Sequence, residues 1–169
     1  MKITIDLETM GNTSNSAIVS IGAVAFENEI VNEFECNIDL QSCIDKGLVV
    51  TASTVLWWIN QSETAKQAIS KPNALKLEQA LIQFSLWMMP YGKREVWGNG
   101  SDFDNVILSN AYRACDLPLP WQWYNNRCYR TAKAMYPYNR KQSSTAHTAL
   151  QDARDQAVHL ITILRPLSL

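Results

Sequence analysis

The sequence predicts an α/β protein in which a mixed five-stranded sheet is flanked by helices, all within one domain over residues 1–169. Three segments near the start have the composition of strands, and segments with helical periodicity then alternate with shorter strand-like ones. This order is typical of a mixed sheet with helices packed against it. The length of 169 residues suits a single domain, because domains commonly contain about 100 to 200 residues.

The first three strands are expected close to the N-terminus. We expect them over residues 2–6, 17–26 and 30–38. In the third segment larger residues alternate with charged or smaller ones, as in a strand with one buried face. Residues 27–29 form the turn between the last two strands, which should therefore pair as an antiparallel hairpin.

Helical periodicity begins in the middle of the chain, where residues 51–60 are predicted to form a short helix. A longer helix is predicted from apolar residues that recur on one face: Leu77, Leu81, Phe84 and Met88. Residues 95–97 form a short fourth strand, which a glycine-rich segment ends. Ser101 or Asp102 is placed to cap the next helix.

The last part of the chain is expected to add one strand and two helices. Residues 123–127 are predicted to form the fifth strand, residues 128–135 a short helix and residues 136–144 a loop. The final helix ends before Pro166. Its apolar face contains Leu150, Ala153, Ala157, Leu160, Ile161 and Leu164.

Composition limits the class of protein. No segment approaches the roughly 18 consecutive apolar residues of a membrane-spanning helix, so we expect a soluble protein. The four cysteines show no C-x-x-C spacing, which argues against a zinc site or a disulfide framework and favours a cytoplasmic location. The net charge of −1 and the pI near 6.1 indicate that any nucleic acid is bound locally, and not through overall positive charge.

Asp6 and Glu8 form a D-x-E pair at the end of the first predicted strand. Side chains two positions apart on a strand point to the same face, so these carboxylates should lie together. Neighbouring like charges repel unless a cation neutralises them, and carboxylate oxygens suit Mg²⁺ or Mn²⁺. The alternative is two exposed loop acids, and the pair alone does not decide between them.

His147 and Asp152 lie five residues apart at the predicted start of the last helix. A neutral histidine accepts a proton from water near neutral pH, which is the task of a general base. The alternative for His147 is a structural histidine near a helix end. We assign His159, deeper in the same helix, to that structural class.

Two acids compete for one role after the fourth strand. Asp102 is placed as a helix cap, whereas Asp104 lies in the first turn, where a carboxylate also suits the helix dipole. A purely stabilising role for Asp104 therefore stays open. Asp155, three residues beyond Asp152, is a similar rival that is otherwise explained as a solvated acid.

The motifs occur together in the order and spacing of one enzyme family. An early D-x-E, a middle F-D followed by N-V-I-L, and a late H-x-A-x-x-D-A resemble the DnaQ-like (DEDDh) 3′-to-5′ exonucleases. The resemblance covers almost the whole chain and implies the ribonuclease H-like fold. The segment W-G-N-G-S-D-F-D-N-V-I-L and the Trp57-Trp58 pair resemble the phage exodeoxyribonuclease VIII-like branch. One departure is the T-M-G-N after Glu8, where proofreading subunits and oligoribonucleases usually carry Thr-Gly or Met-Thr-Gly.

The resemblance implies hydrolysis of single-stranded DNA or RNA from the 3′ end, with nucleoside 5′-monophosphates as products. Two divalent ions, about 4 Å apart in such nucleases, would stabilise the attacking and leaving oxygens. Asp6 would bridge both ions, Glu8 and Asp152 would hold the ion on the side of the attacking water, and Asp104 would support the second. His147 would deprotonate the water.

Substrate contacts are expected near the carboxylates. Thr9 and Met10 directly follow the acids and are placed to contact the terminal nucleotide, and Phe103 next to Asp104 joins them. Trp57 and Trp58 point about 100° apart on a helix, so both cannot enter one core. We expect Trp57 to offer a stacking surface, worth about 1 to 3 kcal/mol per base. The alternative is a tryptophan at a protein interface.

A basic strip lies within residues 127–151, which contain no acid. Its cations are Arg127, Arg130, Lys133, Arg140 and Lys141. The strip either faces phosphates or is an ordinary solvated surface.

Other function classes fit less well. An aspartyl-nucleophile phosphohydrolase would need Asp at position 8, and a ribonuclease H-type endonuclease lacks H-x-A-x-x-D-A. A non-catalytic module that binds nucleic acid or a polymerase does not need all five candidate residues. Resemblance to small family members makes a homodimer a further expectation.

Overall fold

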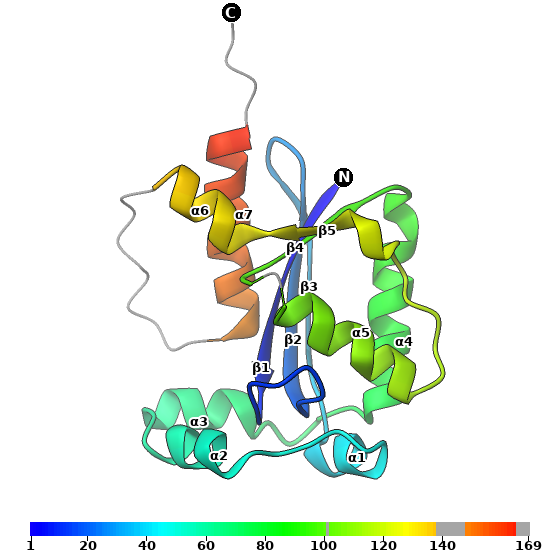
Figure 1. Ribbon diagram of the computed structural model, residues 1–169, viewed down its shortest axis with the longest axis vertical. Helices are drawn as coiled ribbons and strands as arrows, with labels where there is room; N and C mark the ends of the chain where they lie inside the picture. The colour runs from blue at the N-terminus through cyan, green and yellow to red at the C-terminus, as the bar shows by residue number, and fades with distance from the viewer. Residues whose placement is uncertain (101, 138–147, 165–169) are drawn as a thin grey trace, which may run out of the picture.

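The computed structural model describes residues 1–100, 102–137 and 148–164. Its strands are β1 (Lys2–Thr9), β2 (Ile18–Phe26), β3 (Ile30–Asn37), β4 (Glu95–Gly98) and β5 (Asn126–Cys128). They form one sheet in the order β3-β2-β1-β4-β5, antiparallel from β1 to β3 and parallel from β1 to β5 (Figure 1). The predicted mixed five-stranded sheet is therefore confirmed, with β1 at its centre.

The helices flank this sheet. They are α1 (Leu40–Asp45), α2 (Ala52–Ile59), α3 (Glu63–Ile69), α4 (Leu77–Met88), α5 (Asp104–Ala114), α6 (Tyr129–Met135) and α7 (Ala149–Leu164), with 3-10 turns η1 (Met89–Tyr91) and η2 (Trp123–Asn125). In the part of the chain described here, no helix combines the length and apolar character needed to cross a bilayer.

Two apolar cores lie on the two faces of the sheet. The odd-numbered residues of β1 pack with α4 and α5 in the larger core, which includes Phe84, Leu108 and Tyr112. On the other face, Trp97 and residues of β2 pack against Ala153, Ala157 and Leu160 of α7. Two even-numbered residues of β1 contact the first half of α7: the Thr4 hydroxyl donates to the carbonyl of Ala153 at 2.8 Å, and Asp6 accepts from Gln156 at 2.8 Å.

Several element boundaries differ from the prediction. The N-cap of α5 is Phe103, so the expected cap at Ser101 or Asp102 is wrong; Ser101 itself lies outside the described residues. The carboxylate of Asp104 accepts a hydrogen bond from Asn99, which holds the chain in a longer turn before the helix. Residues 123–125 form η2, and only residues 126–128 pair as β5. Helices α1 and α3 were not predicted, and residues 138–144 of the expected loop are outside the described residues.

Candidate active site

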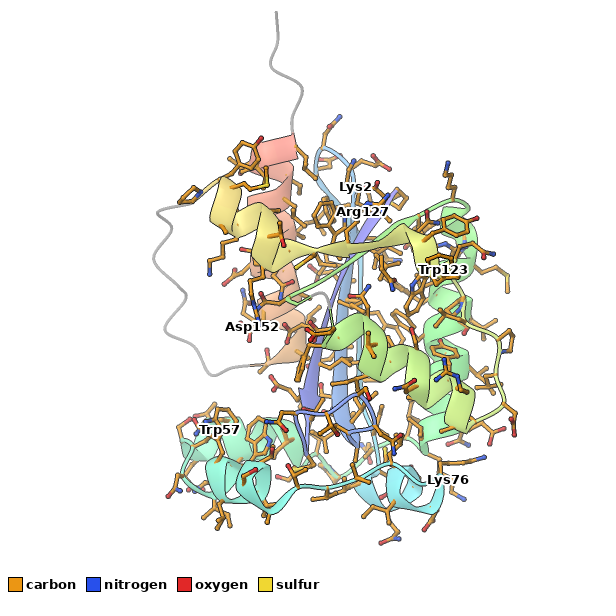
Figure 2. All side chains as sticks on the ribbon, in the orientation of Figure 1. Lys2, Trp57, Lys76, Trp123, Arg127 and Asp152 are labelled. Carbon is orange, nitrogen blue, oxygen red and sulfur yellow. The ribbon has the colours of Figure 1, made fainter. Side chains whose placement is uncertain are left out.

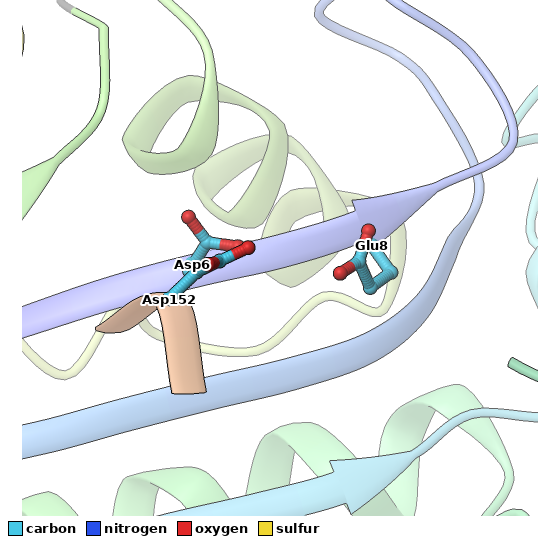
Figure 3. A group of neighbouring side chains, drawn as sticks. All are labelled: Asp6, Glu8 and Asp152. Carbon is cyan, nitrogen blue, oxygen red and sulfur yellow. The ribbon is translucent and has the colours of Figure 1, made fainter. Parts of the chain in front are cut away.

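Asp6 and Glu8 project from the same face of β1, as their spacing predicts (Figure 3). Leu7 between them points the opposite way and is buried in the larger core. Both carboxylates lie within the strand and are half-buried. The alternative of two exposed loop acids is therefore wrong.

Asp152 reaches these carboxylates from the first turn of α7, because α7 lies unusually close to β2. Gly22 pairs with Asp6 across the sheet. A Cβ atom at Gly22 would lie 2.1 Å from the carbonyl carbon of Ala149 and 2.2 Å from the nitrogen of Leu150. The missing side chain thus admits the helix backbone. One carboxylate oxygen from each of Asp6, Glu8 and Asp152 lies within 4.8 Å of the others (Figure 3).

Asp104 is anchored where β1 and β4 diverge. Pairing between these strands ends at Thr4 and Trp97. Beyond that point Asp104 Oδ1 accepts a hydrogen bond from the Leu7 N–H at 3.2 Å, and its Oδ2 accepts one from the Asn99 N–H at 2.7 Å. The carboxylate is 2% exposed and bridges the two strands. This position brings it within electrostatic reach of Asp6 and Glu8.

Burial and mutual repulsion raise the pKa values of these carboxyl groups. Burial raises the pKa of Asp6 well above its usual value, and its three carboxylate neighbours add to the rise. Burial, followed by repulsion from Asp152 and Asp104, raises the pKa of Glu8 to about 7. Burial raises the pKa of Asp104 to about 6, although backbone hydrogen bonds and the charge of Arg130 oppose the rise. Negative charge is therefore costly here unless a cation balances it.

Gln156 orients the carboxylate of Asp6 and was missed by sequence reasoning. Its Nε2 donates to Asp6 Oδ1 at 2.8 Å, and its side chain is 4% exposed. Its Oε1 is buried and has no hydrogen-bond partner among the residues that the structure describes. The available signal was its position one helical turn after Asp152, since residues four apart share a helix face.

The donor set fits a divalent metal ion. Three carboxylates converge, and a fourth is held at their side. Hard oxygen donors of this kind suit Mg²⁺, Mn²⁺ or Ca²⁺. The buried acceptor of Gln156 adds an oxygen that is able to take a hydrogen bond from a coordinated water.

A cavity of about 420 Å³ opens beside the cluster. Glu8 belongs to both, and Thr9, Trp57 and Phe103 line the cavity as well. Met10 is not among the lining residues: its N–H donates to Ala17 and its side chain packs against the core. Three of the four expected substrate contacts are thus placed at one cavity.

The two adjacent tryptophans of α2 occupy different environments. Trp58 is buried, and its Nε1 donates to the carbonyl of Thr9 at 3.0 Å, which ties α2 to the end of β1. Trp57 is 50% exposed and stands against the Trp58 ring at 78° with centroids 4.8 Å apart. The inference that both cannot enter one core is confirmed.

The two histidines, His147 and His159, differ in position. His147 lies outside the described residues, so its expected role stays a prediction. His159 is buried, with Nδ1 2.9 Å from the Tyr129 hydroxyl and Nε2 2.9 Å from the carbonyl oxygen of Tyr136. Since a carbonyl only accepts, Nε2 carries the proton in these contacts. His159 thus links α7 to α6, as a structural histidine does.

The rival acids lie apart from the three-carboxylate cluster. Asp102 is exposed in the turn before α5. Asp155 accepts a hydrogen bond from Gln151 at 3.0 Å along α7. Neither belongs to the group whose oxygen atoms converge.

The chain is similar to known exonucleases. A family model described as the 3′-5′ exoribonuclease Rv2179c-like domain matches residues 1–164. An exodeoxyribonuclease of Enterobacteria phage T4 is 29% identical over 125 residues, covering 64% of this chain and 54% of that protein. The chain thus spans about half the length of that relative.

One solved structure shows the fold. It is the nuclease domain of 3′hExo, a DEDDh family member, bound to rAMP, with a TM-score of 0.61 at 16% identity, covering 97% of this chain and 91% of that chain. The expected ribonuclease H-like fold is confirmed. The family match over residues 1–164 confirms the resemblance to 3′-to-5′ exonucleases found in the motifs: the chain belongs to the 3′-5′ exoribonuclease Rv2179c-like family.

Proposed function

We propose that this protein is a metal-dependent 3′-to-5′ exonuclease that hydrolyses single-stranded DNA or RNA to nucleoside 5′-monophosphates. The observation that carries the proposal is the convergence of Asp6, Glu8 and Asp152 within 4.8 Å, beside a cavity that shares Glu8. The cluster suits cations that bind a phosphodiester, and the cavity offers a place for the terminal nucleotide. We further propose that residues 1–169 work as one domain.

Two ions of Mg²⁺ or Mn²⁺ are the proposed cofactor. Asp6 would bridge them, Glu8 and Asp152 would hold one, and Asp104 would support the other. When bound, such ions stabilise charge on the attacking and leaving oxygens. Hydrogen bonds hold two of the carboxylates in position: Gln156 orients Asp6, and two backbone amides orient Asp104.

His147 is the proposed general base. It would take the proton of the attacking water and pass it to solvent, which a neutral imidazole is able to do near pH 7. Support comes from its spacing to Asp152 in H-x-A-x-x-D-A.

The cavity is proposed to bind the 3′-terminal nucleotide. Trp57 offers an exposed ring for stacking, held in orientation by Trp58. Phe103 and Thr9 contribute an apolar and a polar wall. Met10 is left out of this proposal, because it does not line the cavity and its partly buried side chain packs against the core.

The experiment follows 5′-labelled single-stranded DNA and RNA of one sequence with Mg²⁺, Mn²⁺ or chelator. The wild-type protein should shorten the labelled strand stepwise from its 3′ end, and only when metal is present. The substrate that is degraded faster, DNA or RNA, identifies the preferred sugar. Asp6→Asn should be inactive, whereas Asp102→Asn, which changes an exposed acid outside the cluster, should retain activity. Intact substrates in every lane would refute the proposal and favour a non-catalytic binding module. Light scattering on the same preparation tests the homodimer.

A further inference from the structure

Two arginines of the basic strip, three residues apart, have different surroundings. Arg127 in β5 is committed to an ion pair: its Nε and Nη2 donate to Glu95 Oε1 at 3.2 and 3.0 Å. Arg130 in α6 is exposed, and its Nη2 donates to the carbonyl of Asn99 at 2.8 Å. Within the described part of the chain, no carboxylate forms an ion pair with Arg130.

A single residue, Asn99, links Arg130 to the carboxylate site. The backbone of Asn99 connects them, because its N–H donates to Asp104 Oδ2 at 2.7 Å while its carbonyl accepts from Arg130. Burial raises the pKa of Asp104, and the charge of Arg130 is close enough to oppose that rise. A guanidinium with remaining N–H donors is therefore held at the edge of the site.

Helix α6, which carries Arg130, and helix α2, which carries the cavity residue Trp57, lie on opposite sides of the start of α7 (Figure 1). The guanidinium of Arg130 lies against the turn before α5: a Cβ atom at Gly100 would be 3.7 Å from Arg130 Nη2 and 3.3 Å from the Cβ of Phe103, which lines the cavity. Trp57 and Glu8 line the cavity, on α2 and the end of β1. Figure 1 shows α2 below the start of α7 and α6 above it, and Figure 2 places Asp152 between Trp57 and Arg127 in the same view. A strand with its terminal nucleotide in the cavity and its last phosphodiester at the carboxylates would therefore continue toward α6.

The balance of charge between the metal ions and the carboxylates suggests why a cation is needed beside the path of the strand. Two divalent ions would carry four positive charges, which the carboxylates of Asp6, Glu8, Asp104 and Asp152 balance. The cluster thus leaves no positive charge for the phosphates farther along the strand. An arginine fork suits phosphate, since it is able to donate two parallel hydrogen bonds.

Resting on the proposed function, we propose that Arg130 binds the first phosphate on the 5′ side of the scissile one. Arg130 thereby favours polynucleotides over substrates that contain a single phosphodiester. The task differs from that of the carboxylates, which act on the scissile phosphate in every substrate.

The test compares Arg130→Gln with Arg127→Gln on two substrates. One is a single-stranded oligonucleotide, and the other is the p-nitrophenyl ester of thymidine 5′-monophosphate, which has a scissile phosphodiester and no further phosphate. Arg130→Gln should lower kcat/KM on the oligonucleotide about tenfold, mainly through KM, and change ester hydrolysis less than about twofold. Arg127→Gln should change neither, and Arg130→Lys should restore part of the loss because it keeps the charge.

A second readout excludes an indirect effect through Asp104. Calorimetric titration with Mn²⁺ should give the same affinity for wild type and Arg130→Gln, and the salt dependence of oligonucleotide binding in Ca²⁺ should lose about one unit of slope. Three results for Arg130→Gln would overturn the assignment: an equal loss of kcat/KM on both substrates, weaker Mn²⁺ binding, or no loss of kcat/KM at all. None of them would contradict the proposal that the protein is an exonuclease. A wild type that hydrolyses neither substrate would instead refute the proposed function, and this inference with it.

Discussion

The two faces of β1 show how one strand serves folding and chemistry separately. On one face Ile3, Ile5 and Leu7 are at most 5% exposed and pack in the larger core. On the other, Asp6 and Glu8 carry carboxylates whose pKa values burial raises, to about 7 for Glu8. The apolar face stabilises the fold, whereas on the other face the neighbouring carboxylates repel one another unless a cation balances their charge. Changes on the two faces should therefore have opposite effects on stability.

The largest effect is expected from Asp6→Asn. The amide keeps the shape of the side chain and still accepts from Gln156, but it removes one of the negative charges proposed to bind the metal ions. Activity should fall on the order of a thousandfold or more, since metal ions contribute several kcal/mol of transition-state stabilisation. In chelator near pH 7.5 the free energy of unfolding, measured in urea, should rise above that of wild type.

Ile5→Ala is the matched change on the opposite face. Ile5 is fully buried, so truncation should cost about 2 to 5 kcal/mol of unfolding free energy. Activity per folded molecule, assayed at low temperature, should stay close to that of wild type. If Asp6→Asn destabilised the protein as much as Ile5→Ala does, the two faces would not differ in the way described.

Gly22→Ala tests whether close approach of α7 builds the site. The new methyl group would overlap the backbone at Ala149 and Leu150, so α7 must move outward and carry Asp152 with it. A displacement of about 1 Å is expected to reduce kcat about a hundredfold, with a stability loss of about 1 to 3 kcal/mol. Activity assays with circular dichroism on the same samples measure both. Unchanged kcat in a folded variant would show that α7 does not need this contact.

Gln156→Met should have a smaller effect. Methionine has a similar volume but cannot donate to Asp6, so Mn²⁺ affinity measured by calorimetry should fall about tenfold or more. Gln151→Met is the control, because it makes the same change on the same helix at a side chain that bonds Asp155 instead. Equal affinities in the two variants would remove Gln156 from the support of the site.

The sequence predicts the parts of this site that depend on local spacing. The D-x-E pair needs only the two-residue period of a strand, and the H-x-A-x-x-D-A segment needs only the start of a helix. Gln156 and Gly22 could not be assigned in this way, because their roles depend on which face of α7 meets which points on β1 and β2. Such contacts are set by tertiary packing, which spacing within one segment does not specify.

The fold follows the same division. Long periodic elements such as β2 and α7 were predicted, whereas the short helices α1 and α3 were missed. Elements of six or seven residues give only a weak periodic signal, and of the three such α-helices among the described residues only α6 was predicted. Asp102 is a residue type that often caps helices, yet the helix begins later, because the Asp104 carboxylate accepts hydrogen bonds from the N–H groups of Leu7 and Asn99. A long-range hydrogen bond thus overrides a local preference.

The most direct test of the account is thermal melting from about pH 5 to 8, with and without Mn²⁺, for wild type and Asp6→Asn. The pKa values of Glu8, about 7, and Asp104, about 6, lie above those expected in the unfolded chain, so between about pH 4.5 and 7 the folded state binds more protons. Metal-free wild type should therefore lose stability as pH rises, Mn²⁺ should restore it, and Asp6→Asn should show a weaker response to both. A melting temperature of wild type that stays flat with pH and does not respond to Mn²⁺ would contradict a carboxylate site built for divalent cations.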